Sequence, residues 1–296
     1  MNIMRIALYG RLVKDADKAF YQRIIHFLQV NKVDLFVYDQ FLNALHQAQI
    51  DTRNANAFHS HDDLQNAQVD LLFSLGGDGT LLDTLGLVRD TTIPVLGINA
   101  GRLGFLAGVG REDLEQALTA VLNGQYSLDK RALLAFDSDQ TYFGDQPFAL
   151  NEFTIHKKDA SSMITIHTFL NGELLASYWA DGLIVCTPTG STAYNLSCSG
   201  PILVPTSDNF VITPIAPHNL NIRPIVVPGN SIISFEVEGR HDQILCTLDA
   251  RVATVAMQVP LAIRKAEHTI NLVRLHETHF LQTMRQKLNW GRDERN

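Results

Sequence analysis

The stretch VDLLFSLGGDGT, residues 69–80, decides how the first part of this chain folds. Its apolar portion, Val69 to Leu75, predicts a buried β-strand. The glycines that follow allow the backbone to bend, and they let its N–H groups approach an anion without a Cβ in the way. A strand followed by such a loop is a typical phosphate site of α/β proteins, so we expect Asp78 to lie at a reacting phosphate.

The residues after this loop predict a helix. Leu81, Leu82, Leu85 and Val88 follow helical spacing, and Thr80 can cap the helix at its start. The N-terminus of a helix carries a partial charge that favours anions. A plain tight turn is the alternative interpretation, since Asp and Gly favour turns for their own reasons. The strand before and the helix after favour phosphate chemistry.

The first 125 or so residues alternate short apolar strands with amphipathic helices. Further strands are predicted at Ile6 to Tyr9, Leu35 to Tyr38 and Ile93 to Ile98. Two helices are indicated by apolar residues at helical spacing: Phe20, Ile24, Phe27 and Leu28, then Leu114, Ala117, Leu118, Val121 and Leu122. Residues 49–68 are polar and predict a loop or weak connection. This βαβ rhythm implies a parallel sheet covered by helices.

After residue 124 the pattern changes to runs of β-branched and aromatic residues. Seven strands are predicted: Ala132 to Phe136, Phe148 to His156, Met163 to Leu170, Leu183 to Thr187, Ile232 to Val237, Gln243 to Leu248 and Val252 to Met257. Asn171-Gly172 is a hairpin signal between two such runs. We therefore expect an α/β domain over residues 1–125, an all-β domain over 126–270, and a segment 271–296 whose amphipathic part, Phe280 to Leu288, packs back on the first domain.

Composition limits the class of protein. The chain has 296 residues, 19% of them charged and 46% hydrophobic, which is typical of globular proteins. Its net charge of −7 argues against a general nucleic-acid binder. Three cysteines without C-x-x-C spacing suggest neither a disulfide framework nor a zinc site and fit a reducing cytoplasm. No apolar run approaches the ~20 residues of a membrane helix, so we expect no membrane association.

Two further polar groups lie in the predicted β domain. Asp181-Gly182 is followed by TPTGSTAY, residues 187–194, whose hydroxyls can bond ribose, base edges or phosphate and whose Tyr194 can stack on a flat ring. A Ser/Thr-rich loop with a helix cap is the alternative. The pair Asn151-Glu152 can bind an adenine edge and ribose hydroxyls, although a solvated strand end would look the same.

Taken in this order, the motifs resemble those of the NAD kinase family over most of the chain. The matching stretches are GGDGT at 76–80, NAGRLGFL at 99–106, Asn151-Glu152, Asp181-Gly182, TPTGSTAY at 187–194 and KLNW at 287–290. GGDGT alone is shared with diacylglycerol, sphingosine and phosphofructokinase-like kinases. The TPTGSTAY stretch narrows the resemblance to NAD kinases, which implies a Rossmann-like first domain.

The resemblance implies Mg²⁺-dependent transfer of the ATP γ-phosphoryl group to the 2′-hydroxyl of the adenosine ribose of NAD, giving NADP and ADP. Asp78 looks like the residue that orients and deprotonates this hydroxyl, more by position than by basicity, since an ordinary Asp pKa near ~4 makes a weak base. The implied binding residues are Gly76, Gly77, Gly79 and Thr80 for phosphate, and Phe105, Asn151, Glu152, Asp181, Thr189, Thr192, Ala193, Tyr194 and Ser197 for NAD. In this family the residue at Asp181 often reaches a neighbouring subunit's ligand, so we expect a homotetramer or homodimer. We predict no metal-ligating side chains.

Some positions depart from the family pattern. Trp179 stands where many relatives have a basic residue, and Asp249-Ala250-Arg251 stands where Asp-Gly-Gln is expected. His59-Ser60-His61-Asp62-Asp63 looks like a metal cluster, but a solvated loop is the better interpretation. A lipid kinase is the rival enzyme, disfavoured by the acidic balance. A regulator that only binds a dinucleotide is the other alternative, and no G-x-G-x-x-G follows the first strand to support it.

Overall fold

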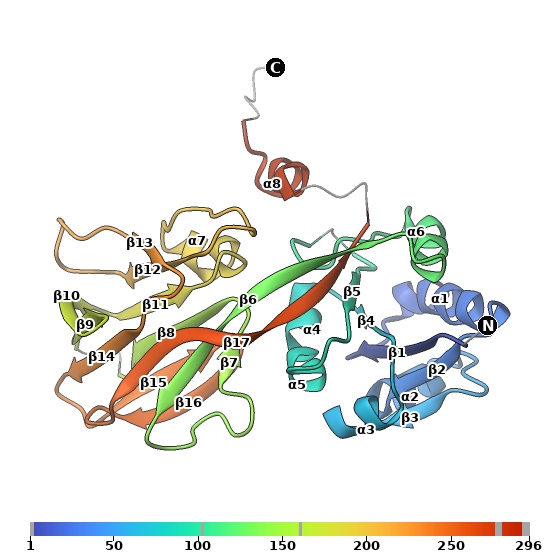
Figure 1. The fold of residues 1–296 in the computed structure, drawn as a ribbon, viewed down its shortest axis with the longest axis horizontal. Coiled ribbons are helices and arrows are strands. Elements are labelled where there is room, and N and C mark those ends of the chain that lie inside the picture. Colours follow the sequence, from blue (N-terminus) through green and yellow to red (C-terminus); the bar gives the residue numbers. More distant parts are fainter. Residues whose placement is uncertain (1–2, 102–103, 160–161, 276–279, 292–296) are drawn as a thin grey trace. The chain divides into compact units, whose positions relative to one another are not determined.

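The computed structural model describes residues 3–101, 104–159, 162–275 and 280–291. The chain forms two compact units (Figure 1). The first is Met1–Lys130 together with Ile270–Asn296, and the second is Arg131–Thr269. Residues 102 and 103 of the NAGRLGFL motif lie outside the described residues.

The first unit contains the parallel sheet that the strand–helix alternation predicts. Its strands lie in the order β3-β2-β1-β4-β5, all parallel, and the end of β17 pairs with β5. Their bounds are β1 Arg5–Gly10, β2 Asp34–Tyr38, β3 Asn56–Phe58, β4 Leu71–Leu75, β5 Val95–Ile98 and β17 Leu261–Arg274. The order reverses between β1 and β4, and open α/β sheets bind ligands at the carboxyl ends of strands at such a point. The loop after β4 is GGDGT.

The first unit also contains several helices, three of which close the core of this sheet. Their bounds are α1 Lys18–Val30, α2 Asp39–Gln47, α3 His61–Asn66, α4 Asp78–Asp83, α5 Leu85–Val88, α6 Leu114–Leu122 and α8 Phe280–Leu288, with a 3₁₀ turn at Asp15–Asp17. Buried side chains of α1, α2 and α6 pack in one core with those of β1, β2, β4 and β5. The apolar spacing of α1 and α6 therefore predicted their buried faces correctly.

The prediction of a loop over residues 49–68 is wrong, because this stretch holds β3 and α3. Ser60 caps α3 by accepting from the Asp63 N–H, and the Asp63 carboxylate accepts the Ser60 N–H in return. The polar residues thus form a capping box. Within the described residues, no three His, Cys, Asp or Glu side chains converge as metal ligands.

The prediction that Thr80 caps the helix is also wrong. α4 begins at Asp78, with Gly77 at the N-cap, so Thr80 lies inside the first turn. The Thr80 side chain folds back onto Gly76, where an added Cβ would lie 2.3 Å from the Thr80 Oγ1. The glycine therefore makes room for the threonine.

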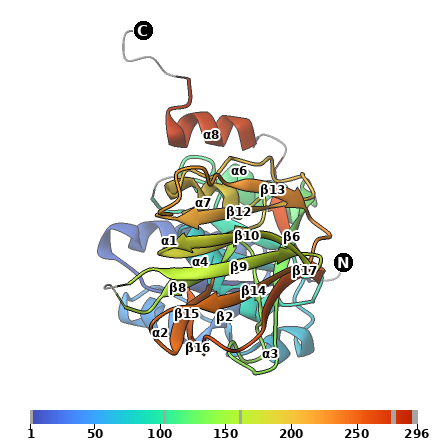
Figure 2. The same cartoon turned by 90° about the vertical axis from the view of Figure 1, so that its left-hand side faces the viewer.

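The second unit consists of two sheets packed face to face. The six-stranded sheet has the antiparallel order β13-β12-β11-β8-β15-β16, and β10, β9, β14 and β17 form antiparallel neighbours in the other sheet, where β6 pairs with β17 and β7. β10 packs against β12 and β11 against β9 (Figure 2). The bounds are β6 Ser127–Ser138, β7 Phe148–Ala149, β8 Glu152–Lys157, β9 Ile164–Leu170, β10 Glu173–Ala180, β11 Gly182–Cys186, β12 Asn209–Ile215, β13 Ile225–Pro228, β14 Ile233–Glu238, β15 Gln243–Leu248 and β16 Arg251–Ala256. A 3₁₀ turn, Gly190–Thr192, and a short helix, α7 Tyr194–Ser197, follow β11.

The Asn-Gly hairpin between β9 and β10 is confirmed. Asn171 and Gly172 both have positive φ, at 52° and 85°, and Leu170 pairs with Glu173 across the turn. The single strand expected over Phe148 to His156 is wrong, because the chain breaks into β7 and β8. The break occurs where a side-chain carboxylate takes the backbone N–H groups away from strand pairing.

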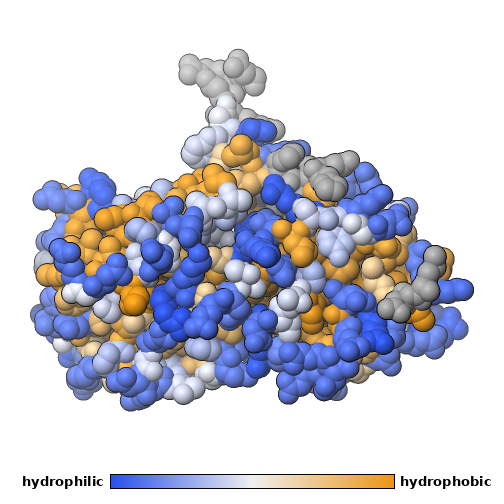
Figure 3. All heavy atoms as spheres, in the orientation of Figure 1, coloured by the Kyte–Doolittle hydropathy of each residue, from blue (hydrophilic) through white to orange (hydrophobic). Residues whose placement is uncertain are grey.

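None of the helices within the described residues has the length and apolar character needed to cross a membrane. Figure 3 shows polar side chains over much of this face, with apolar side chains gathered over the β12 and β13 part of the second unit. All three cysteines are free thiols.

Candidate functional site

The loop after β4 places the Asp78 carboxylate against the segment that follows β5. Asp78 Oδ2 accepts the Phe105 N–H at 2.8 Å, and Oδ1 accepts the Leu106 and Ala107 N–H groups at 3.0 Å each. A carboxylate offers about four lone-pair sites, so three are filled. The carboxylate is thus fixed in orientation and keeps acceptor capacity for one more donor.

Gly104 makes this contact possible. A Cβ added at this residue would lie 1.8 Å from Asp78 Oδ1. By contrast, a Cβ at Gly108 or at Gly79 would meet no described atom within 4 Å. Gly104 is therefore required by the close approach of the Asp78 carboxylate, whereas in the sequence it is only one residue of the NAGRLGFL motif.

A positive charge lies beside the same loop. Arg11, directly after β1, donates to Asp83 Oδ1 and Oδ2 at 2.7 and 2.5 Å and to the Gly79 carbonyl oxygen at 3.3 Å. More than half of the Arg11 side chain is exposed. The guanidinium group therefore tethers α4 to the end of β1. Sequence reasoning missed Arg11, because a single Arg after a strand carries no motif.

The Phe105 ring lies against α8 within the first unit. Its centroid is 6.2 Å from that of Phe280, and Lys287 Nζ lies 5.3 Å from it. A cation over a ring face and a second aromatic ring both stabilise the position of Phe105.

In the second unit, Asn151 and Glu152 lie at the break between β7 and β8 and are held by Asp249. Asp249 Oδ2 accepts the Leu150 N–H at 2.9 Å, and Oδ1 accepts the Asn151 and Glu152 N–H groups at 2.8 and 3.2 Å. The Asp249 N–H donates to the Glu152 carbonyl oxygen at 2.9 Å. In the sequence, Asp249 stands out only as part of a departure from the family pattern.

The Glu152 side chain is buried, at 8% exposure. Burial first and the negative charge of Asp249 second raise the pKa of its carboxyl, the Tyr194 N–H partly opposes them, and the resulting pKa is about 8. Its Oε2 has no hydrogen-bond partner within the described part of the chain. A buried polar atom without a partner costs free energy, so this oxygen is suited to a ligand hydroxyl.

The TPTGSTAY loop is built partly from its own hydroxyls. Thr187 Oγ1 donates to the Leu150 carbonyl oxygen at 2.5 Å, and Ser191 Oγ donates to the Pro188 carbonyl oxygen at 2.7 Å. Both side chains are fully buried, so these two hydroxyls shape the loop. This differs from the expectation that all four hydroxyls suit a ligand.

Gly190 packs this loop onto the Asn-Glu pair. A Cβ at Gly190 would lie 2.1 Å from the Asn151 carbonyl oxygen. Thr189 Oγ1 accepts from Arg131 Nη1 at 3.1 Å, and Thr192 Oγ1 donates to the Thr189 carbonyl oxygen at 3.3 Å. Arg131, from β6, is a further site neighbour that the sequence did not indicate.

Tyr194 presents a ring at the surface of the second unit. It is 37% exposed, and one face stacks on His156, with centroids 5.8 Å apart and planes inclined by 20°. Asp181 forms an ion pair with Lys157 at 2.5 Å, and Ser197 is exposed at the end of α7. Ala193, between Thr192 and Tyr194, is half-buried.

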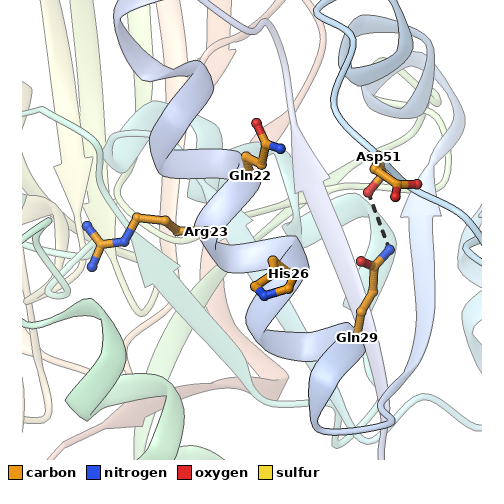
Figure 4. A pocket seen from close by; sticks show the side chains of 5 residues that line it. All are labelled: Gln22, Arg23, His26, Gln29 and Asp51. Carbon is orange, nitrogen blue, oxygen red and sulfur yellow. Dashed lines mark hydrogen bonds between the residues drawn. The ribbon is translucent and has the colours of Figure 1, made fainter.

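The predicted residues thus form two groups, one in each unit. Gly76, Gly77, Asp78, Gly79, Thr80 and Phe105 belong to the first, and Asn151, Glu152, Asp181, Thr189, Thr192, Ala193, Tyr194 and Ser197 to the second. A separate hollow of about 350 Å³ lies along α1, lined by Gln22, Arg23, His26, Gln29 and Asp51 (Figure 4). It contains none of the predicted residues. Across it, Gln29 Nε2 donates to the Asp51 carbonyl oxygen at 3.3 Å.

Comparison with known families gives matches over both units. Residues 7–126 match the model of the ATP-NAD kinase N-terminal domain, and residues 150–275 match that of the ATP-NAD kinase C-terminal domain. The chain is 46% identical to the NAD kinase of Cytophaga hutchinsonii over 294 residues, which covers 99% of this chain and all of the relative. It is also 46% identical to the NAD kinase of Flavobacterium psychrophilum over 295 residues, with the same coverage.

Two solved structures share the fold. A yeast NADH kinase complexed with NADH superimposes with a TM-score of 0.85 at 22% identity, covering 99% of this chain and 89% of that one. An NAD kinase from Archaeoglobus fulgidus in complex with ATP superimposes with a TM-score of 0.75 at 23% identity, covering 97% of this chain and 99% of that one. The predicted fold class, a parallel α/β domain followed by a β domain, is therefore confirmed.

Proposed function

This chain belongs to the NAD kinase family, and on that premise we propose which of its residues perform the reaction. The family consists of phosphotransferases that use ATP and NAD as substrates. Their reaction moves the γ-phosphoryl group of ATP to the 2′-hydroxyl of the adenosine ribose of NAD, giving NADP and ADP. The hydroxyl oxygen forms a new bond to phosphorus, and the bond from phosphorus to the β,γ-bridging oxygen breaks.

We assign Asp78 to the reacting hydroxyl, and the observation that carries this assignment is its hydrogen-bond geometry. Three backbone N–H groups fix the carboxylate and leave acceptor capacity for one donor, which the 2′-hydroxyl supplies. Phosphoryl transfer depends mainly on alignment and charge stabilisation. Asp78 therefore acts by orienting the hydroxyl and by accepting its proton as the new bond forms.

Gly76, Gly77, Gly79 and Thr80 are proposed to contact the phosphates of ATP. Gly77 and Gly79 are accessible backbone positions where a Cβ would meet little or nothing, which leaves space for an anion beside the N–H groups. The described side chains form no cage of metal ligands, and Mg²⁺ commonly binds through substrate phosphates. We therefore propose that Mg²⁺ enters with ATP as part of the substrate.

The second unit is proposed to hold the adenosine portion of NAD. The Glu152 carboxyl is offered to the ribose hydroxyls, and Asn151 to the adenine edge. Tyr194 presents an exposed ring for stacking. Thr189, Thr192, Ala193 and Ser197 complete this group from the same loop and helix α7, and Asp181 and Phe105 keep the NAD-binding roles that the family resemblance implies.

We propose that the protein is a homo-oligomer, a tetramer or a dimer. β13 is an edge strand of its sheet, and Ile225 and Val226 on it are more than a third exposed. Leu220, before β13, is 86% exposed, and Trp179 on β10 is 43% exposed. Apolar side chains gathered on an edge strand favour contact with another protein surface, and a second copy is the partner that the family resemblance indicates.

The free thiols fit a cytoplasmic location.

The experiment is NADP formation by the purified protein with Mg²⁺, ATP and NAD, with NADH and diacylglycerol as parallel acceptors. We expect NADP from NAD in the wild type. The variant Asp78→Asn keeps an acceptor oxygen but loses the charge, so NAD binding remains while turnover falls at least ~10²-fold. Unchanged turnover in Asp78→Asn would remove the proposed role of this carboxylate.

A further inference from the structure

We propose that Asp249 is a positioning residue for NAD, which sets the backbone of Asn151 and Glu152 and keeps the Glu152 carboxyl in its neutral form. This inference rests on the proposed function, because it assumes that Asn151 and Glu152 hold the adenosine of NAD. It adds a residue that touches no substrate in the proposed scheme and acts only through its neighbours.

The backbone geometry supports the positioning role. Asp249 lies in the turn between β15 and β16, where Leu248 pairs with Arg251, and it has a positive φ of 52°. The turn directs the carboxyl inward, where it accepts three successive N–H groups from residues 150–152. Three donors to one carboxylate fix the backbone at Asn151 and Glu152, and therefore the direction in which their side chains point.

The Asn-Glu segment lies just beyond the end of the β15–β8 strand pairing, where Asp249 takes over its N–H groups. β15 pairs with β8 only as far as Leu248 opposite Phe153, so the ladder ends where the Asp249 carboxylate begins to accept N–H groups. The Asn151 carbonyl oxygen accepts the Thr187 N–H at 2.9 Å, which ties the same peptide to the TPTGSTAY loop. Asp249 and this loop therefore hold the Asn-Glu segment from both sides.

The charge of Asp249 also acts on Glu152. The titratable groups near the Glu152 carboxyl are Asp249, Cys186 on the paired strand β11, and Tyr194. Burial raises the pKa of both the Cys186 thiol and the Tyr194 hydroxyl above their usual values, so neither ionises near pH 7. Burial raises the pKa of Asp249 above its usual value, and the N–H groups of residues 150–152 and the nearby Arg251 guanidinium oppose this effect, because each of them favours the ionised carboxylate. Asp249 is thus the anionic neighbour that disfavours a second negative charge.

A neutral Glu152 can do what an ionised one cannot. A protonated carboxyl donates one hydrogen bond and accepts others, whereas a carboxylate only accepts. Ribose hydroxyls donate and accept, so a neutral carboxyl can pair with two of them without burying a charge. NAD affinity should therefore depend on the proton that Asp249 helps to retain.

The test is NAD binding by calorimetry between pH 6 and pH 9.5, without ATP, so that turnover plays no part. In the wild type we expect the Kd for NAD to rise about tenfold per pH unit above the Glu152 pKa of about 8. In Asp249→Asn the midpoint of this rise moves at least one pH unit lower. A Kd raised equally at every pH, with the midpoint unmoved, would show a merely structural role for Asp249 and overturn the inference.

Three controls separate the possible outcomes. Glu152→Gln cannot ionise, so its NAD affinity should not vary with pH, and adding Asp249→Asn to it should produce no midpoint. Asp208→Asn removes an exposed carboxylate of the same unit that pairs with Lys265, and it should leave the profile unchanged. If Asp249→Asn does not fold, a flat wild-type profile still overturns the inference. A wild type that binds no NAD contradicts the proposed function instead.

Discussion

Replacing Gly104 by Ala should displace the Asp78 carboxylate, although Asp78 itself is not substituted. The added Cβ would lie 1.8 Å from Asp78 Oδ1, whereas non-bonded heavy atoms prefer about 3.5 Å. The carboxylate or the Gly104 backbone must therefore move by on the order of 1.5 Å. Hydrogen bonds of 2.8–3.0 Å to Phe105, Leu106 and Ala107 do not survive such a shift.

The size of the effect follows from these three bonds. A hydrogen bond to a charged group contributes about 1.5–3 kcal/mol, and water can solvate the displaced carboxylate because the residue is only half-buried. We expect the free energy of unfolding to fall by about 2–4 kcal/mol, less than the sum of three bonds. Misplacing a catalytic group by about 1 Å costs about 10²-fold in rate, so kcat should fall by at least that factor.

The assay is urea unfolding together with NADP formation, for Gly104→Ala and for Gly108→Ala. Gly108 lies in the same segment, but a Cβ there meets no described atom within 4 Å, so its replacement controls for the general effect of Gly to Ala. We expect Gly108→Ala to retain wild-type turnover and stability within about 1 kcal/mol. If Gly104→Ala matched Gly108→Ala in both measurements, the packing argument for Asp78 would be refuted.

Three other predictions concern single residues. The pKa of Glu152 rises from 4.5 in the unfolded chain to about 8 in the folded protein, so between these values only the folded protein binds the proton. The contribution of this group to the free energy of unfolding is therefore largest below pH 4.5. It is lost as the pH rises to 8, by up to about 5 kcal/mol. Urea unfolding at pH 5 and pH 9 should show this fall in the wild type, and a flatter profile in Glu152→Gln. Gly190→Ala places a Cβ 2.1 Å from the Asn151 carbonyl oxygen, so calorimetry should show at least tenfold weaker NAD binding, and unchanged binding would contradict this packing. Arg11→Ala removes an ion pair whose arginine is more than half exposed, and Asp83 keeps the hydrogen bond from the Tyr9 hydroxyl. Thermal unfolding should therefore show a loss of no more than about 1 kcal/mol, and a larger loss would contradict this estimate.

Much of the fold could be predicted from the sequence because its signals are local. The apolar run before GGDGT gave β4, the helical spacing of leucines and phenylalanines gave α1 and α6, and Asn171-Gly172 gave a hairpin. The polar stretch 49–68 failed as a loop prediction, since its Ser and Asp residues serve a helix cap. Polar composition alone does not separate a loop from a short capped helix.

The sequence by itself determined the family and the position of Asp78 after a buried strand. It also indicated the Asn-Glu and TPTGSTAY motifs as parts of the candidate site. Only the tertiary structure decided how these residues are held. Asp249 accepts N–H groups from residues 97 to 99 positions earlier, and Asp78 accepts them from residues 27 to 29 positions later. Sequence periodicity reports neighbours within a few residues, whereas a buried carboxylate must be satisfied by whatever donors the fold brings to it. For that reason the sequence did not show that Gly104 makes room for Asp78, nor that Asp249 holds residues 150–152; both contacts exist only in the folded chain.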